Sequence, residues 1–453
     1  MTTHPTQGVP FADSPAAVAG GALPRRLGLL ATTAIVVGTI IGSGIFRVPA
    51  VVAGTVGVPA GVAAVWIIGG LITLCGGLSL AELAAAYPRT GGVFVYLHEA
   101  YGSLVAFLFG WTMLFLAPGA LAGIALVFAE YLGTLVSLSA DSVQIVAAIT
   151  LAGCGVMAYR SVTGVGGLVS AATFAKVGAL VTLVFLAFLL GDGSVGSLGQ
   201  GAPPAADARW SGVGIGLVAA LWAYNGFQDM VSVAGEVRDP ARVLPRALIA
   251  GMLIVIAVYL AANAAYLYVL PFDALRASPV VASDTMVRIV GESGAAAVAA
   301  MVMTSTFGAV VAVTLLYPRI FFAMAAAGLL FSPLARVHPR YRTPHVAVAA
   351  QTVAAVAFSL SRSFEQVTAA FVLGVWPFLA LATVAVIVLR RKQPGLHRPY
   401  RTPGYPVVPL IFVAGTAWVI GSALVANPVT TLAGMGLTLL GLPVYWFWKR
   451  RVF

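Results

Sequence analysis

Glycine and serine interrupt the first long apolar segment at a point where the chain could bind an anionic group. The stretch GTIIGSGIF, Gly38–Phe46, lies inside this segment. A glycine within a helix costs about 1 kcal/mol relative to alanine, and in the middle of a membrane every backbone N–H and C=O needs a partner. A helix broken at Gly42, Ser43 and Gly44 would free N–H groups at the positive end of its outer half, where a carboxylate could bind. The alternative is that the small residues allow close helix packing.

A second apolar segment carries the same kind of interruption. It contains ALWAYNGFQDMVSVAGEV, in which Tyr224, Asn225 and Gly226 are followed by Asp229 and Glu236. Acidic side chains within a membrane span are costly, and they are functional candidates by default. Because Glu236 precedes a charged stretch, the alternative is that it marks the cytoplasmic end of the span. Two interrupted segments predict a binding site between them.

A single lysine, Lys176, lies within the apolar stretch AATFAKVGALV, which offers it no acidic partner. A charge at such depth costs at least ~2.5 kcal/mol unless it is compensated. Two functional roles fit: a fixed ammonium in the place of a coupling sodium ion, or a titrating amine that carries protons. The alternative is a structural lysine bound to backbone carbonyls. Thr304, Ser305 and Thr306 either bond back to their own helix or contact the lysine's segment.

Motifs for enzyme chemistry are missing from the sequence. His98–Glu99 begins like a zinc-protease motif, but HEAYG lacks the second histidine, and no glycine-rich loop ends in Lys-Ser/Thr. Glu82 is predicted to be a structural hydrogen-bonding residue. We therefore expect no enzyme, no cofactor and no metal site.

Composition indicates the class of protein that must position these residues. The 453 residues are 60% hydrophobic and 9% charged, whereas soluble proteins carry about 25% charged residues. The apolar runs are long and continuous, which predicts an all-α polytopic membrane protein with 12 transmembrane helices. The predicted spans are roughly 27–56, 60–86, 95–132, 143–160, 164–190, 211–236, 245–270, 294–327, 344–361, 366–390, 405–425 and 428–447. The first, third and eighth exceed the ~20 residues that a span needs, so we expect them to be tilted, bent or broken.

Basic residues, which give a net charge of +11, gather in alternate loops. One set of loops holds nearly all of them, with Arg319 counted among these, and the other set holds only Arg209, Arg276, Arg288 and Arg362. Such asymmetry places both termini in the cytoplasm and does not indicate nucleic acid as a partner. Residues 1–24, rich in Pro, Ala and Gly, are expected to be a disordered cytoplasmic tail.

The positions of the interrupted spans predict an internal repeat. The first and sixth spans are five apart, and an odd number of spans inverts the topology of the second repeat. We therefore expect residues 25–453 to form a single transporter domain. Residues 27–190 would be the first repeat, 211–390 the inverted second repeat and 405–447 two appended helices. A substrate site would lie near the membrane midplane, between the two broken helices.

Six collinear motifs resemble those of the amino acid–polyamine–organocation (APC) superfamily of permeases, and within it the bacterial L-type amino-acid transporter branch. They are GTIIGSGIFRVPA (38–50), SLAELAAAYPRTGGVFVYL (79–97), ALWAYNGF…AGEVRDPARVLPRALI (220–249), YPRIFFAMAAAGLL (317–330), HPRYRTPHVAV (338–348) and LRRKQP…RPYRTPGYPVVP (389–409).

The resemblance implies a five-plus-five inverted-repeat fold and assigns roles to residues. It implies that the broken backbone of the first span holds the substrate carboxylate, at Ile41, Gly42, Ser43 and Gly44. It implies that carbonyls at the second break hold the amino group, around Ala223, Tyr224, Asn225 and Gly226. Trp222 resembles the aromatic residue that closes over substrate. Lys176 resembles the lysine of sodium-independent members, which lies near the first break and near hydroxyls such as that of Ser305.

Two departures from the family pattern bear on substrate and partner. Related bacterial sequences often have Asp where this chain has Asn225, which weakens the case for a carboxylate that reads a cationic substrate. Animal L-type chains pair with a glycoprotein through a cysteine in a loop that corresponds to residues 132–141, where this chain has none. We therefore expect no disulfide-linked heavy chain.

The leading interpretation is sodium-independent transport of amino acids, neutral ones in particular, across the cytoplasmic membrane by alternating access. Exchange and proton symport both remain open, so that the expected partners are the amino-acid substrate, the lipid bilayer and, for symport, protons. One alternative is a cationic amino-acid or polyamine carrier, for which Asp229 is the one candidate acid. An alternative of another class is a transporter-like amino-acid sensor.

Overall fold

The structure is a computed structural model, and it describes residues 23–136, 138–193, 206–278, 280–360, 364–426 and 428–452. The tail predicted to be disordered, residues 1–24, lies outside the described residues except for its last two. The described part is helical, and its one β-type pairing is an isolated bridge between Leu27 and Val237.

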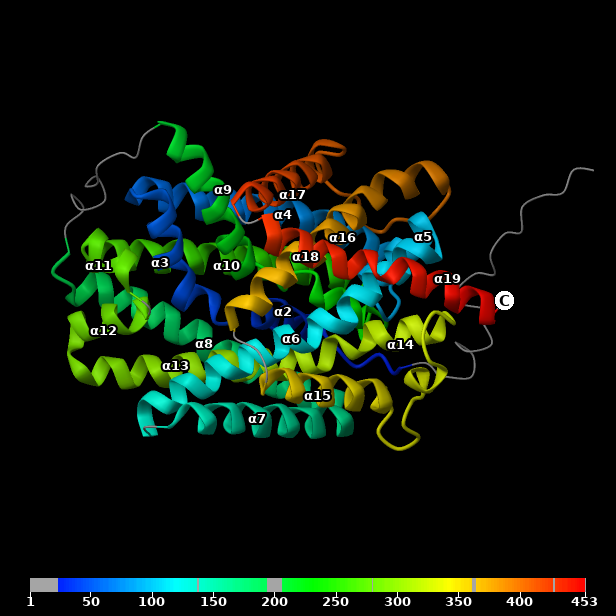
Figure 1. The fold of residues 1–453 in the computed structure, drawn as a ribbon, viewed down its shortest axis with the longest axis horizontal. Helices are drawn as coiled ribbons and strands as arrows, with labels where there is room; N and C mark the ends of the chain where they lie inside the picture. Colours follow the sequence, from blue (N-terminus) through cyan, green and yellow to red (C-terminus); the bar gives the residue numbers. More distant parts are fainter. Residues whose placement is uncertain are drawn as a thin grey trace, which may run out of the picture.

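Helices follow one another along the whole described chain (Figure 1). In chain order they are α2 (Leu29–Ile40), α3 (Gly44–Val56), α4 (Pro59–Ala86), α5 (Val93–Tyr101), α6 (Ser103–Val136), α7 (Ala140–Arg160), α8 (Val162–Leu190), α9 (Ala206–Ala223), η3 (Asp229–Glu236), α10 (Pro240–Val269), α11 (Phe272–Ala277), α12 (Val281–Val290), α13 (Glu292–Leu316), α14 (Pro318–Ala326), η4 (Ser332–Ala335), α15 (His345–Ser359), α16 (Phe364–Lys392), α17 (Val407–Ala426), α18 (Pro428–Leu439) and α19 (Gly441–Val452).

Among the described residues, eight helices are long and apolar enough to cross a membrane, and the bent pair α2 and α3 makes a ninth span. The three other predicted spans consist of shorter helices: α9 with η3, the 15-residue α15, and α18 with α19. Helical segments therefore occupy all the predicted places, while the count of twelve spans stays a prediction.

None of the three overlong predicted spans is a single regular helix, in agreement with the expectation that they are tilted, bent or broken. The first is interrupted between α2 and α3. The third divides at Gly102, whose φ of 84° lies in the left-handed region that suits glycine and ends α5. The eighth divides after Tyr317, because Pro318 has no N–H to continue the helix ladder and instead takes the first position of α14.

Helices distant in the sequence pack side by side. α4 packs against α10, α6 against α13, and α7 against α15. α2 packs against α8, α10 and α13, which places the first interruption inside the bundle. In Figure 1, α7 and α15 lie along one side of the bundle and α17 along the opposite side.

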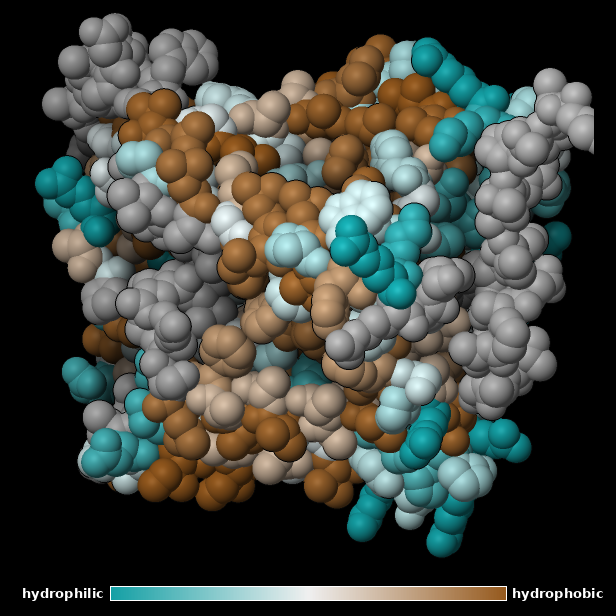
Figure 2. Space-filling model, turned by 45° about the vertical axis from the view of Figure 1, so that its right-hand side comes forward, coloured by the Kyte–Doolittle hydropathy of each residue, from teal (hydrophilic) through white to brown (hydrophobic). Residues whose placement is uncertain are grey.

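Burial separates core helices from lipid-facing ones. In α6 78% of the most apolar window is buried, whereas in α7, α8 and α17 only 28% is. On α8, Phe174, Phe185 and Phe188 are each at least half exposed, as suits side chains in contact with lipid. Figure 2 shows broad brown apolar surface over much of the visible flank. The interrupted helices are therefore enclosed by an apolar shell.

Candidate functional site

The first break lies between Ile40, where α2 ends, and Gly44, where α3 begins, and the two helices are bent by 40°. The carbonyls at the end of α2 and the N–H groups at the start of α3 have no partners within their own helices. The predicted interruption at Gly42, Ser43 and Gly44 is therefore present, and it gives the site a negative and a positive backbone end.

The second break lies between Ala223, the end of α9, and Asp229, the start of η3. Gly226 has a φ of 115°, and a Cβ atom there would lie 2.8 Å from the carbonyl of Thr39. Only glycine satisfies both the left-handed backbone and this close approach. The two breaks are thus in direct contact.

Two hydroxyl groups lie between the breaks. Thr39 Oγ1 lies 2.9 Å from the carbonyl of Ile35, in its own helix, and 3.1 Å from that of Gly226. The buried hydroxyl of Tyr259, on α10, lies 2.9 Å from the carbonyl of Ile40 and 3.0 Å from that of Ala223. The sequence did not single out Tyr259, because a tyrosine in an apolar helix usually packs or faces the membrane interface.

Lys176 is fully buried on α8 and reaches the first break. Its Nζ donates to the carbonyls of Gly38 at 2.7 Å, Ile41 at 2.5 Å and Ser305 at 3.3 Å. An ammonium has three N–H donors, so each of them has an acceptor. This geometry matches both the structural alternative and the fixed-ammonium role, because the carbonyls are those of the break itself.

Ser305, on α13, lies on the same side of the break. Its Oγ is 3.2 Å from the carbonyl of Ile41 and 3.3 Å from that of Gly42. The hydroxyls of Thr304 and Thr306 instead bond back to their own helix, at the carbonyls of Ala300 and Val302. Of the three hydroxyls in this run, Ser305 is therefore the one that contacts the break.

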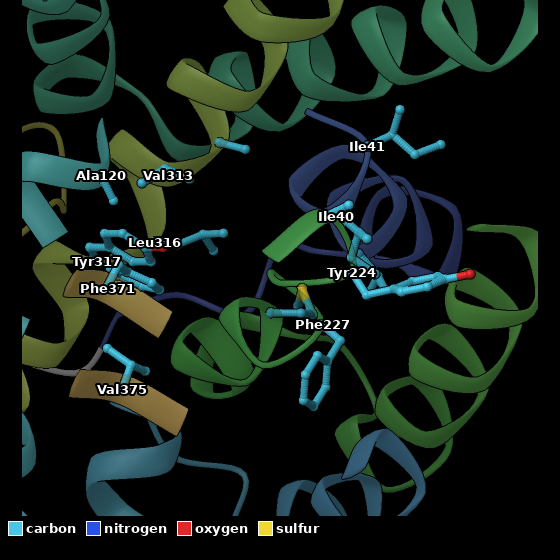
Figure 3. Packing of buried hydrophobic residues seen from close by; sticks show 14 of the residues in the cluster. Ile40, Ile41, Ala120, Tyr224, Phe227, Val313, Leu316, Tyr317, Phe371 and Val375 are labelled. Atoms are coloured by element: carbon cyan, nitrogen blue, oxygen red, sulfur yellow. The ribbon is translucent and has the colours of Figure 1, made fainter. Parts of the chain in front are cut away.

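A central cavity lies where the breaks meet. It brings together most of the predicted residues with side chains from α6, α13 and α16. Its lining comprises Thr39, Ile40, Gly42, Ser43, Gly44, Ala120, Ile124, Trp222, Ala223, Asn225, Asp229, Val313, Tyr317 and Phe371. Figure 3 shows Ala120, Val313, Tyr317 and Phe371 gathered on one side, with Ile40 across from them.

Three of the predicted substrate-binding residues, Ile41, Tyr224 and Gly226, are not part of this lining, and neither are the predicted coupling residues Lys176 and Ser305. The Tyr224 hydroxyl donates to the carbonyl of Trp66 at 3.1 Å, and its ring packs edge-on against that of Trp66. In Figure 3 the Tyr224 ring points away from Tyr317 and Phe371. Tyr224 therefore helps to form the break through its backbone, while its side chain packs behind it.

Trp222 is half-buried and lines the cavity. Its ring meets that of Phe371 edge-on, with the centroids 6.0 Å apart. This position is compatible with the predicted closing role, which stays a prediction.

Two further cavities flank the central one. One, which we call the outer cavity, shares Ser43 with it and is also lined by Arg47 and Glu130. The other, which we call the inner cavity, shares Asp229, Tyr317 and Phe371 with the central one. The central cavity therefore adjoins both of the others.

Charged residues elsewhere have structural partners. Glu82 accepts hydrogen bonds from Arg390 at 2.7 and 2.9 Å and from the backbone N–H of Thr402 at 2.7 Å, which confirms its predicted structural role.

The assignment of Arg319 to a loop was wrong. It is fully buried at the start of α14, and its Nε lies 2.9 Å from Oε1 of the equally buried Glu236. An arginine can be buried in this way because a carboxylate pairs with it.

Comparison with known proteins matches residues 27–444 to a family described as amino acid permease. The serine/threonine exchanger SteT of Bacillus subtilis is 30% identical over 95% of this chain and 98% of its own length. The human large neutral amino acids transporter small subunit 2 is 30% identical over 99% of this chain and 86% of its own. The human cystine/glutamate transporter is 27% identical over 95% and 87%, respectively.

Proposed function

Because this chain belongs to the amino acid permease family, we propose that it carries amino acids, neutral ones in particular, across the cytoplasmic membrane by alternating access without sodium. Transporters rather than enzymes make up this family and these relatives, so the prediction that the chain is not an enzyme is confirmed. The observation that carries the proposal is the central cavity, which lies between two interrupted helices.

The two breaks suit a zwitterion. The start of α3 presents N–H groups and the positive end of a helix dipole, which favour the substrate carboxylate near Gly42, Ser43 and Gly44. The end of α9 presents carbonyls and the negative end of a dipole, which favour the ammonium near Ala223 and Asn225. Opposite charges of the ligand would thus face opposite helix ends.

Sodium independence is supported by the position of Lys176. Its ammonium group lies among the carbonyls of Gly38, Ile41 and Ser305, which are oxygen donors of the kind that also coordinate a sodium ion. A fixed cation there would leave no room for a second one. Exchange and proton symport both remain compatible with this arrangement.

The five-plus-five repeat is supported by packing. α4 with α10, α6 with α13, and α7 with α15 each join one predicted span to the span five places later. Pairs of this kind are expected when two inverted repeats face one another. We propose this repeat for residues 27–190 and 211–390, with both termini in the cytoplasm.

A cationic amino acid or polyamine is the second candidate substrate, because Asp229 lines the cavity. The names of the three relatives reported above specify serine and threonine, large neutral amino acids, or cystine and glutamate, and none of these three names specifies a cationic substrate. We therefore keep the cationic class as the alternative.

Uptake into proteoliposomes tests the proposal. The purified protein is reconstituted and challenged with radiolabelled amino acids in sodium-containing and sodium-free buffer, with a panel of unlabelled competitors. We expect saturable uptake that is equal in both buffers and is competed by neutral amino acids. Strict sodium dependence of uptake would contradict the proposed sodium independence. Competition by lysine and polyamines alone would favour a cationic amino acid or polyamine as the substrate. Binding without any uptake or exchange would indicate a sensor.

A further inference from the structure

Asp229, Tyr317 and Phe371 line both the central and the inner cavity, so they form the partition between the two. Asp229 comes from the start of η3, Tyr317 from the junction of α13 and α14, and Phe371 from α16. A substrate that moves from the central to the inner cavity must therefore pass these side chains.

Asp229 has spare hydrogen-bonding capacity. It is 6% exposed, it accepts a hydrogen bond from Gln228 Nε2 at 3.0 Å, and its other oxygen lies 3.4 Å from the hydroxyl of Tyr317. A carboxylate offers about four acceptor sites, and no lysine or arginine among the described residues forms an ion pair with it. The start of η3 offsets part of a negative charge through the helix dipole.

The bond from Tyr317 is easily replaced. Its 3.4 Å length is well beyond the usual ~2.7–2.8 Å of an O–H···O hydrogen bond, so it is weak. A ligand hydroxyl or ammonium at normal distance would be a better partner for a buried carboxyl group, since leaving that group poorly satisfied is costly. Asp229 is thus arranged to exchange the hydrogen bond from the Tyr317 hydroxyl for one from a ligand hydroxyl or ammonium.

Tyr317 is also joined to the predicted closing residue. Its ring stacks on Phe371 at 6.4 Å and 16°, and Phe371 meets Trp222 edge-on at 6.0 Å. A shift of Tyr317 would therefore reach Trp222 through one intervening ring, that of Phe371.

We propose that Asp229 determines substrate specificity: it accepts a hydrogen bond from a donor on the substrate side chain, and this bond releases Tyr317 from the partition. The proposal rests on the proposed transport function and specifies its substrate class as amino acids with a side-chain hydroxyl or ammonium. Ala120, Ile124 and Val313 supply apolar wall to the same cavity, and Asp229 is the one acidic residue among those that line it.

Matched competitor pairs test this specificity in proteoliposomes with radiolabelled L-alanine as the probe. L-Threonine and L-valine have nearly the same shape and differ in a hydroxyl, while L-lysine and L-norleucine differ in an ammonium. We expect at least one donor-bearing member to inhibit alanine uptake about tenfold more strongly than its apolar counterpart, because a site built around a polar group rejects analogues that lack it. The pair that shows the difference identifies the donor as hydroxyl or ammonium.

Three variants locate the effect. Asp229→Leu should bring the ratio of inhibition by the donor-bearing competitor to inhibition by its apolar counterpart down to about one, because the donor-bearing competitor then binds more weakly. A loss of folding would lower all uptake and would not change this ratio selectively. Asp229→Asn keeps an acceptor oxygen, so it should keep a threonine preference but lose a lysine preference. Tyr317→Phe removes the internal competitor and should strengthen inhibition by the donor-bearing member; it also serves as the test if Asp229→Leu does not fold.

Equal inhibition within both pairs by the parent protein, or an unchanged ratio in Asp229→Leu, would overturn the inference while leaving amino-acid transport intact. Failure of every labelled amino acid to enter the vesicles would instead overturn the proposed function.

Discussion

Gly42 and Gly44 lie two positions apart, yet a side chain added at each would meet different surroundings. A Cβ atom on Gly42 would have nothing within 4 Å, whereas on Gly44 it would lie 2.7 Å from Cα of Ala223. The sequence allowed two interpretations of these glycines, a break that binds a ligand and close helix packing, and each applies to a different residue. Gly44 allows the helices to pack closely, and Gly42 keeps space open in the cavity.

Gly42→Leu should abolish uptake while leaving the melting temperature close to that of the parent, because its side chain enters open space in the cavity. Gly44→Leu should be destabilised by about 1–3 kcal/mol or more, because it forces the backbone of Ala223 to move. Uptake and thermal unfolding in detergent measure the two effects. Gly178→Leu, at an exposed position of α8 with open space around it, is the matched control. Normal uptake by Gly42→Leu would contradict the carboxylate site.

At the scale of elements, α8 is joined to the first broken segment by side-chain hydrogen bonds. Two of its side chains donate hydrogen bonds to the first broken segment: Lys176 donates to the carbonyls of Gly38 and Ile41, and the hydroxyl of Thr173 donates to the carbonyl of Ala34 at 3.0 Å. Of these two side chains, the lysine also donates to α13, at the carbonyl of Ser305. The break, α8 and α13 therefore share one cation, and a change in its contacts would be felt by all three.

Lys176→Ala should lower uptake at least about tenfold, because it removes the ammonium donor from the carbonyl of Gly38 and leaves that of Ile41 with Ser305 alone, and a buried group left unsatisfied costs roughly 1–3 kcal/mol. Thr173→Val, which removes a bond to α2 away from the break, is the control and should retain most activity. With all three donors bonded, we expect a fixed ammonium, and hence parental uptake that is flat with pH near neutrality. A pH transition that disappears in Lys176→Ala would show a titrating amine, and an alanine variant as active as the parent would rule out both roles.

At the scale of the whole molecule, the ends of the two broken helices away from the cavity are tied together. The carbonyl of Glu236 accepts hydrogen bonds from the N–H groups of Arg26 at 2.8 Å and Leu27 at 3.0 Å, and Arg238 donates back to Leu27 at 2.8 Å. The side chain of Glu236 pairs with Arg319 of α14. The chain before α2, the end of η3 and the start of α14 thus meet at one buried ion pair.

Arg319→Leu should lower the free energy of unfolding by about 3–5 kcal/mol, because it leaves the Glu236 carboxylate buried without its partner. The double variant Arg319→Leu with Glu236→Leu should recover most of this loss, since neither charge is then buried. Melting temperatures in detergent provide the comparison. Equal destabilisation in the single and double variants would show that the pair acts through packing rather than charge.

The sequence by itself determined the features that follow from local chemistry in lipid. Glycines within apolar segments predicted both breaks, a lysine within an apolar segment predicted a compensated cation, and basic loops with long apolar runs predicted a polytopic helical protein. These inferences needed no knowledge of neighbours, because a membrane penalises any unsatisfied backbone group or charge wherever it occurs.

Only the tertiary structure decided which partners these residues have. Tyr259 reaches Ile40 across 219 positions of sequence, and Arg319 reaches Glu236 across 83. No periodicity in the sequence specifies such pairs, since a helix in an apolar bundle can present the same face to several neighbours. For the same reason the sequence could name Asp229 as an acid near the break but could not place it between two cavities. That position depends on how η3, the junction of α13 and α14, and α16 pack together.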